Sequence, residues 1–584
     1  MITTLIPSLL ASLIAWPAQQ APPPPVAPPA QEPATEAPQE SRGVKIHEAS
    51  AFQGYTLLAP IMDKRTFLLD MDGKVVHQWQ HDLPPGNSVY LQPDGRLYRA
   101  ARPQNNPTFK GGGEGGVLEE YSWDGELLWS MDWNDASKLM HHDFEVMPNG
   151  NLLFIAWEEI DREVALAHGK DPELLGDGNL WPDYIVEVEP IRPRGGKVVW
   201  EWHTWDHIVQ DTIEDGPNYA EIWEDPGRIN INGEGEKEIV SEEERKRLIA
   251  LGYLSPDDDG RPKVNGSSDW MHSNGINYEP ERDLIVMSVR RFCEIWVIDH
   301  STTTAEARTD QGGNYGRGGR LLFRYGNPMA YGRGGLEDRQ LFFQHDSQFI
   351  ETGLPGAGNL LVYNNGQGRP NEPWSSVDEI AFAEVAPGKI EFDDNGHFAL
   401  SSPTWRYGSA DNTEFYSSFI SGAQRLPNGH TLICEGADGR VFEVTPKGEI
   451  VWEYLSPWGD PNAVGTPGQR TASQAAADTR PPSVGDTPPP GTQDPPPGNG
   501  PPPGRGGPPG PPPAGQAPDD PDAPPKPRSG IPPWSLFRAT RIAIDFPAFA
   551  GKDLTPLATQ PLIELAPKQP EQAAETEAIP SNPK

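Results

Sequence analysis

The segment "GAQRLPNGHTLICEGADGRVFEVTPKGEIVWEY", from Gly422 to Tyr454, contains the two short phrases that decide the fold. In the first, an Asn-Gly turn joins two β-rich runs, as a tight β-hairpin requires. In the second, a turn residue and a glycine precede a short strand that ends in an aromatic residue. Together the phrases predict two consecutive hairpins, which form one small antiparallel sheet.

The second phrase recurs along the chain. Its six copies are "DMDGKVVHQW" (from Asp70), "SWDGELLWSM" (from Ser122), "RGGKVVWEW" (from Arg194), "RGGRLLFRY" (from Arg317), "APGKIEF" (from Ala386) and "PKGEIVWEY" (from Pro446). Four-stranded units repeated at roughly 50 to 70 residues are typical of sheets arranged radially. The sequence therefore predicts an all-β protein, a six-bladed β-propeller. A pair of β-sandwiches is the alternative, but sandwiches do not repeat one phrase six times.

The composition divides the chain. Most of the 67 prolines lie in two tracts, which cannot bury enough apolar surface to fold alone. We predict a signal peptide at 1–20, a disordered Pro-rich spacer at 21–42, the propeller at 43–461, a disordered Pro/Gly-rich linker at 462–533 and a carboxyl-terminal segment at 534–584 that can pair with the propeller. The uneven repeat spacing indicates insertions, of which 208–268 is the largest, acidic and partly helical with the pattern "SEEERKRLIALGYL".

The amino-terminal run from Leu5 to Trp16 has the length of a signal-peptide core and is too short to span a bilayer. No other segment is expected to be transmembrane, so the sequence favours a periplasmic or secreted protein. A formal charge of -37 argues against a nucleic-acid surface, since phosphate binding requires a basic face. Cys293 and Cys434 are too few for a disulfide framework and are expected to be buried thiols, although one bridge is an open alternative.

Three histidines occupy equivalent positions on the predicted inner strands of different blades. They are His142 in "LMHHDFEVMPNG", His272 in "DWMHSNGINYEPERD" and His345 in "LFFQHDSQFI", and counting back from the following turn also aligns Asn87 and Ser421 with them. In a propeller the first strand of each blade lines the axis, so these side chains are expected at one mouth of the central channel. Imidazoles there can act as acid, base, nucleophile or metal ligand.

Polar residues near the histidines complete the predicted site. Arg369, in "YNNGQGRP", follows the second strand of the His345 blade, and an arginine beside histidines suits a sulfate or phosphate. Further substrate-binding candidates are Arg290, Asn274, Asn365 and Arg440. We expect no cofactor, and we leave open a metal held by the three histidines.

The order of these segments resembles the arylsulfotransferase family of bacterial exported propellers, over about Gly54 to Tyr454. The resemblance implies transfer of sulfate between phenols through a sulfated histidine, independent of 3′-phosphoadenosine 5′-phosphosulfate (PAPS). It implies that His272 and His345 match two active-site histidines and that Arg369 matches the sulfate-binding arginine. The small-molecule partners would be an aryl sulfate and a phenol.

One departure from the family pattern concerns the nucleophile. The family's nucleophilic histidine is expected in the last blade, near "CEGADGRVFEV", where this chain has no histidine and Arg440 stands roughly in its place. His142 or His345 is therefore expected to be the nucleophile if transfer is covalent. Two other classes stay open: a non-catalytic propeller that binds a partner at the cell surface, and a quinoprotein-like oxidoreductase, because "DGELLW" and "GEIVWEY" are reminiscent of tryptophan-bearing repeats.

Overall fold

The protein is described by a computed structural model that covers residues 42–558, apart from 104, 235–267, 371–372, 383, 387, 391–397, 399–401, 413, 459–531 and 533. The predicted signal peptide, the spacer up to residue 41, nearly all of the linker and the helical pattern at 241–254 lie outside the described residues. Among the described residues, no helix is both long enough and apolar enough to cross a membrane.

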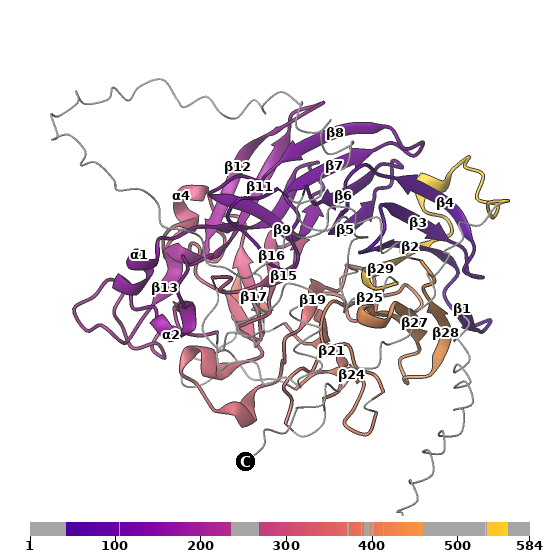
Figure 1. The fold of residues 1–584 in the computed structure, drawn as a ribbon. Coiled ribbons are helices and arrows are strands. Elements are labelled where there is room, and N and C mark those ends of the chain that lie inside the picture. The colour runs from indigo at the N-terminus through magenta and orange to yellow at the C-terminus, as the bar shows by residue number, and fades with distance from the viewer. Residues whose placement is uncertain are drawn as a thin grey trace, which may run out of the picture. The chain divides into compact units, whose positions relative to one another are not determined.

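The strands form six antiparallel sheets in a ring, which confirms the predicted six-bladed β-propeller (Figure 1). The strands of each blade are given from the axis outward. Blade 1 contains β29 (Leu536–Ala543), β2 (Gly54–Pro60), β3 (Arg65–Leu69) and β4 (Val75–Gln80), and blade 2 contains β5 (Pro85–Leu91), β6 (Leu97–Ala101), β7 (Val117–Tyr121) and β8 (Leu127–Asp132). Blade 3 contains β9 (Lys138–Val146), β10 (Leu152–Glu158), β11 (Asp183–Pro190) and β12 (Gly196–His203). Blade 4 contains β15 (Ser273–Glu279), β16 (Leu284–Val289), β17 (Glu294–Asp299) and β18 (Phe323–Tyr325); blade 5 contains β19 (His345–Phe349), β20 (Leu360–Asn364), β21 (Ser376–Ile380) and β24 (Trp405–Tyr407); blade 6 contains β25 (Gly422–Arg425), β26 (Thr431–Glu435), β27 (Arg440–Val444) and β28 (Ile450–Leu455), with β1 (Gly43–His47) added outside β28.

Short elements connect and decorate the blades. They are the helices α1 (Arg162–Ala167), α2 (Pro172–Leu175) and α4 (Thr304–Ala307), the parallel pair β13 (Ile208–Val209) and β14 (Ile229–Asn230), the antiparallel pair β22 (Glu384–Ala386) and β23 (Lys389–Ile390), and 3-10 turns at Thr204–His207, Pro328–Tyr331, Leu336–Asp338, Gly436–Asp438 and Pro547–Phe549. The described part of the predicted insertion at 208–268 thus contains β13 and β14.

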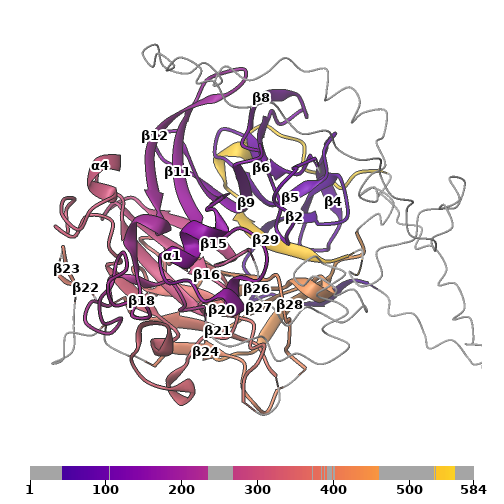
Figure 2. The ribbon, with the colours of Figure 1, turned by 60° about the vertical axis from the view of Figure 1, so that its left-hand side comes forward.

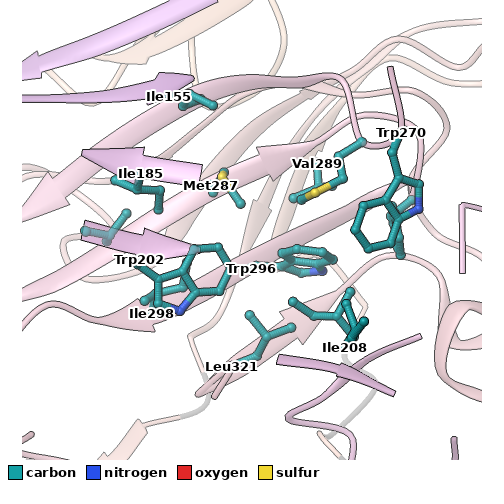
Figure 3. Packing of buried hydrophobic residues seen from close by; sticks show 14 of the residues in the cluster. Ile155, Ile185, Trp202, Ile208, Trp270, Met287, Val289, Trp296, Ile298 and Leu321 are labelled. Atoms are coloured by element: carbon teal, nitrogen blue, oxygen red, sulfur yellow. The ribbon is translucent and has the colours of Figure 1, made fainter. Parts of the chain in front are cut away.

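Hydrophobic residues fill the spaces between neighbouring blades. In β3, Phe67 and Leu69 pack toward blade 6 while Leu68 packs toward blade 2, because successive side chains of a strand point to opposite faces. Six such clusters each join two adjacent blades, and Figure 3 shows the one between blades 3 and 4, with Trp202 and Trp296 in the same layer. Burial on both faces explains why middle strands such as β10 and β16 have hydrophobic residues at consecutive positions rather than at alternate ones.

The repeated phrase has a physical reason. In four of its six copies, a tryptophan at or near the end of the phrase packs against the next blade and donates its indole N–H to a carbonyl in the corresponding turn of that blade. The pairs are Trp79 to Ser122 (3.1 Å), Trp129 to Gly195 (2.8 Å), Trp202 to Gly319 (2.7 Å) and Trp452 to Met71 (2.9 Å). A buried indole N–H needs a hydrogen-bond acceptor. The phrase therefore supplies the outer strand of one blade and also the carbonyl that accepts the indole hydrogen bond from the preceding blade.

Blade 5 departs from the sequence prediction. The sequence predicts that the copy "APGKIEF" forms its outer strand, but within the part of the chain that the structure describes, its β23 pairs with β22 in a separate small sheet and with no other strand. The outer strand is instead β24, whose Trp405 donates its indole N–H to the carbonyl of Pro446 in blade 6 at 2.9 Å. The aromatic anchor on the next blade, rather than the glycine turn, therefore marks the outer strand here.

The ring is closed by the carboxyl-terminal strand. β29 pairs antiparallel with β2 from Gly54↔Ala543 to Pro60↔Leu536, and so supplies the innermost strand of blade 1 (Figure 2, yellow). At the other side of the closure, Gln424 of blade 6 exchanges two hydrogen bonds with the backbone of Arg541, at 2.8 and 3.1 Å. Cys293 and Cys434 are both buried, free thiols.

His300 links blades 3 and 4 through two carboxylates. Its Nδ1 lies 2.7 Å from Asp283 Oδ1 and its Nε2 lies 3.1 Å from Glu187 Oε2. Burial lowers the pKa of His300, but the two hydrogen bonds outweigh it and raise the pKa from 6.5 to about 9. The imidazolium therefore stabilises the folded state.

We expect His300→Gln to lower the free energy of unfolding by about 1–3 kcal/mol at low pH. A group whose pKa is raised on folding contributes fully below its unfolded pKa of 6.5 and loses that contribution as pH rises through about 9. Urea titrations of wild type and variant at a series of pH values should therefore give curves that converge as pH rises through that window. A difference that stays constant with pH would contradict the assignment.

Candidate active site

Irregular inner strands aim polar side chains at the axis. In blade 3, Phe144 and Met140 of β9 face Phe154 and Ala156 of β10, so three residues of β9 lie opposite one. The inner strands of blades 1, 2, 4 and 5 are also shifted near their first residues. Such β-bulges re-aim side chains and are common next to active sites.

Backbone strain accompanies the bulges. His142, His272 and Asn87 have φ values of 53°, 51° and 91°, in the left-handed region that residues with a side chain rarely adopt. In blade 5 the left-handed residue is Asp346, directly after His345, and in blade 6 it is Ile420, directly before Ser421. Strain of this kind persists only where the surrounding structure holds it, and it concentrates at functional sites.

The three predicted histidines come together with His141 in what we call the histidine cluster: His141, His142, His272 and His345. All four are buried, and the rings of His142 and His272 meet edge to face with centroids 4.6 Å apart. Burial lowers the pKa of His142, His272 and His345, and neighbouring positive charges lower it further. These imidazoles are therefore neutral at pH 7, which leaves a lone pair on each ring.

Asn365 sets the orientation of His345. The Nδ1 of His345 lies 2.7 Å from Asn365 Oδ1, and the amide NH2 of Asn365 donates to the carbonyl of Ser417 at 2.7 Å. Because Asn365 must present its carbonyl oxygen to the ring, His345 Nδ1 carries the proton and Nε2 carries the lone pair. Within the described residues, His345 Nε2 has no hydrogen-bond partner. An imidazole nitrogen that is neutral and oriented in this way has the lone pair that a nucleophile needs.

Asp269 holds His272 in a second orientation. Its Oδ2 forms a short hydrogen bond with His272 Nδ1, and the two residues are three positions apart in "DWMH". A carboxylate on Nδ1 fixes the tautomer of an imidazole and stabilises its protonated form, as in an acid–base dyad. The charge of Asp269 opposes the lowering of the His272 pKa that burial causes. Asp269 was not among the residues predicted from the sequence, although a carboxylate three positions before a histidine is a signal that could have identified it.

His142 belongs to a chain of polar groups from blade 3. Its Nδ1 lies 2.9 Å from Nδ1 of His141, whose Nε2 lies 3.3 Å from Asp183 Oδ1. A hydrogen bond between the two Nδ1 atoms needs one donor and one acceptor, so one of the two rings carries a proton on Nδ1 and the other presents a lone pair there. Only His142, the second histidine of "HH", was predicted from the sequence. His141 was not, because the residue that it faces, Asp183, is distant in the sequence.

A glycine loop covers His142. Gly113 has φ of 80°, accepts a hydrogen bond from the His142 backbone N–H at 2.8 Å, and is so close that an added Cβ would lie 2.1 Å from His142 Nε2. Gly113 is the third glycine of "GGGEGG" and packs directly on a ring of the cluster. Only glycine fits this close approach.

The cation at the cluster is Arg290. Its positive charge is the largest electrostatic cause of the lowered pKa of His345, and it also lowers the pKa of His142 and His272. Its Nη2 donates to Gln367 Oε1 at 3.0 Å, and its guanidinium lies 4.9 Å from the centroid of the Phe343 ring. A buried guanidinium held in this way presents fixed N–H donors to an oxyanion.

Arg369 is held nearby on the blade 5 side. It stacks on Trp374 at 3.7 Å and donates to Ser376 Oγ at 2.9 Å, and its Nε makes no hydrogen bond within the described residues. Burial lowers the pKa of Arg369 to about 10, so it stays charged at neutral pH. The contacts that the structure gives it run to blade 5 rather than to the histidines.

Two other predicted residues serve the framework. Arg440 lies on β27 and forms ion pairs with Glu435 (3.0 Å) and Glu453 (2.7 Å), in the outer half of blade 6. Asn274 donates from its amide to the Gln344 carbonyl at 2.8 Å, which joins blades 4 and 5. Among the described residues, no group of three His, Cys, Asp or Glu side chains is placed to hold a metal ion.

The fold and the cluster define a class: a propeller whose inner strands bring neutral histidines and a buried arginine together at its axis. The chain belongs to the arylsulfotransferase (ASST) family, whose model matches residues 49–453. No curated protein sequence matches the chain.

Solved structures similar to this chain are distant. A protein of unknown function from Bacteroides caccae has 12% identity and a TM-score of 0.33, over 71% of this chain and 96% of its own. The periplasmic gluconolactonase PpgL of Pseudomonas aeruginosa has 10% identity and a TM-score of 0.32, over 69% and 96%. Virginiamycin B lyase from Staphylococcus aureus has 9% identity and a TM-score of 0.31, over 71% and 84%.

Proposed function

We propose that this protein transfers a sulfuryl group from an aryl sulfate to a phenol, without PAPS, through a sulfated His345. The observation that carries the proposal is the fixed tautomer of His345, with Nδ1 held by Asn365 and a lone pair on Nε2, next to the charge of Arg290. Membership of the arylsulfotransferase family supports the reaction class.

In the first half of the proposed reaction, His345 Nε2 attacks the sulfur of the aryl sulfate. An N–S bond forms, the S–O bond to the aryl group breaks, and the phenolate leaves with the electron pair of that bond. Arg290 donates hydrogen bonds to the sulfuryl oxygens, which lowers the barrier if the donors are already in place. His272 carries a proton in this step, because the negative charge of the bound aryl sulfate and the Asp269 carboxylate both favour its imidazolium form, and it gives that proton to the leaving phenolate.

In the second half, an acceptor phenol replaces the leaving phenol. Its hydroxyl proton passes to His272 Nε2, its oxygen attacks the sulfur, and the N–S bond breaks with the electron pair returning to His345. The proton that His272 takes from the acceptor in one cycle is the proton that it gives to the leaving group in the next. One histidine thus serves as base and acid, and another as nucleophile.

The direct test is a kinetic assay with the purified full-length protein. Release of nitrophenol from 4-nitrophenyl sulfate should depend on an added phenol acceptor, and varying both substrates should give the parallel reciprocal plots of a ping-pong mechanism. Absence of nitrophenol with every phenol tried would contradict the proposed function. Intersecting plots would retain the function but contradict the covalent intermediate.

Gly113→Ala tests the role of the loop over His142. The methyl group would overlap the His142 ring, so we expect kcat in the nitrophenyl sulfate assay to fall by about tenfold or more. Gly125→Ala is the matched control, since Gly125 also has a left-handed φ, of 84°, but has no atom within 4 Å of an added Cβ. Equal kcat values for the two variants would contradict a functional role for the close approach.

We also propose a periplasmic or secreted location, supported by the apolar run at the amino terminus. Fractionation of cells that express the full-length chain, followed by amino-terminal sequencing of the mature protein, tests it. Recovery of an unprocessed chain in the cytoplasm would contradict this location.

A further inference from the structure

A single arginine from the carboxyl-terminal strand reaches the inner strands of four other blades. Arg538 lies in the bulge of β29 opposite Ala59. Its Nη1 is 2.7 Å from Asp143 Oδ2 in blade 3 and 2.9 Å from the Tyr90 hydroxyl in blade 2. Its Nε is 3.0 Å from Asp346 Oδ1 in blade 5, and its Nη2 donates to the Asn274 carbonyl in blade 4 at 3.2 Å.

The two aspartates that pair with Arg538 directly follow two histidines of the cluster, His142 and His345. Asp143 also accepts hydrogen bonds from Ser88 Oγ at 2.6 Å and from the Ile276 N–H at 3.0 Å. Asp346 accepts one from the Ala423 N–H of blade 6 at 3.0 Å. Arg538, Asp143 and Asp346, which we call the axial layer, therefore connect all six blades next to the histidine cluster.

The charges of the axial layer depend on one another. All three side chains are at least mostly buried, with Asp143 fully so. Even beside Arg538, burial raises the pKa of Asp346 to about 6. Removing the arginine would leave two buried carboxylates without a cation, a change that disrupts buried ion pairs strongly. The preceding residue, Phe537, adds an aromatic contact to His142, with ring centroids 6.2 Å apart.

We propose that Arg538 is a positioning residue, which fixes His142 and His345 through Asp143 and Asp346, so that the site is complete only when β29 closes the ring. Both histidines are joined to their aspartates through the backbone of a bulge, and that backbone has a left-handed residue at His142 in blade 3 and at Asp346 in blade 5. Anchoring the aspartates to one cation holds these strained segments in register.

The test compares Arg538→Gln with Arg541→Gln in the full-length protein. Arg541 lies on the same strand, but its contacts are with Glu443, Thr56 and the Phe52 carbonyl, away from the axial layer. Its substitution removes the same charge from β29 and controls for weaker docking of the strand. Histidine labelled with 15N reports the tautomer of each ring by nuclear magnetic resonance, with signals assigned by single histidine substitutions.

In Arg538→Gln we expect the imidazole signals of His142 and His345 to change and kcat to fall about 10- to 100-fold. In Arg541→Gln we expect a lower melting temperature, unchanged signals of these two rings and wild-type kcat. A folded Arg538→Gln protein with wild-type histidine signals and kcat would overturn the proposal. If that variant does not fold, Arg538→Lys replaces it, and wild-type signals and kcat in Arg538→Lys would overturn the proposal as well.

The kinetic arm of this experiment rests on the proposed function, whereas the resonance arm does not. If wild-type protein transfers no sulfuryl group but the signals of His142 and His345 still depend on Arg538, the proposed function fails and the positioning role stands. If transfer is normal and neither the signals nor kcat respond to Arg538, the positioning role alone fails.

Discussion

His345→Ala is expected to lower kcat for nitrophenol release by about 1000-fold or more, because it removes the group that attacks the sulfur in the first half-reaction and carries the sulfuryl group into the second. The side chain is fully buried and its Nδ1 is held by Asn365, so another histidine cannot take its place without moving. The assay is the phenol-dependent release of nitrophenol from 4-nitrophenyl sulfate.

His430→Ala provides the matched control. His430 follows the last Asn-Gly turn and lies 2.7 Å from Glu443, outside the histidine cluster, so its loss should leave kcat unchanged. Added imidazole should restore part of the activity of His345→Ala, because the vacated space can admit a free ring. Activity of His345→Ala within a few-fold of wild type would contradict the nucleophile assignment.

Arg290→Gln is the second substitution with a large expected effect. Removing a preorganised cationic donor from the transferred group should lower kcat/KM by about 100- to 1000-fold. Arg290→Lys keeps the charge but loses the planar fork, and should lie between wild type and Arg290→Gln.

Arg369→Gln should be compared with Arg290→Gln, because two observations favour different arginines as the residue that binds the sulfuryl group. The family resemblance favours Arg369, and the electrostatics of the histidine cluster favour Arg290. Because the contacts of Arg369 run to Trp374 and Ser376, we expect this variant to lose about tenfold or less in kcat/KM. The reverse order, with Arg369→Gln the more damaged enzyme, would assign the sulfuryl group to Arg369.

Much of the fold could be predicted because one contact between neighbouring blades, an indole hydrogen bond to a turn, is repeated around the ring. Five of the six turn phrases both precede an outer strand and accept the indole N–H of the preceding blade, and in four blades that indole comes from a copy of the phrase, at Trp79, Trp129, Trp202 and Trp452. Blade 5 differs from this pattern. The tryptophan that contacts the next blade, Trp405, follows a different turn, and "APGKIEF" has the sequence of the phrase but is not the outer strand.

The site was harder to predict because its parts are distant in the sequence. The three histidines could be aligned by counting back from their turns, since each lies on or directly before the inner strand of its blade. Asp183, which faces His141, lies in the third strand of the same blade, and Arg538 arrives after the Pro-rich tract. The sequence predicted that the carboxyl-terminal segment can pair with the propeller, but no local pattern identifies β2 as the partner of β29, because the two strands lie at opposite ends of the propeller sequence.

The most direct test of the covalent mechanism is the mass of the protein after reaction with 4-nitrophenyl sulfate in the absence of a phenol acceptor. The sample is quenched in alkali, and the intact mass and the proteolytic peptides are then measured. The account predicts a gain of one sulfuryl group on the peptide that contains His345, lost when phenol is added and absent from His345→Ala. A sulfuryl group on a different residue, or an unmodified protein that still transfers sulfate, would contradict it.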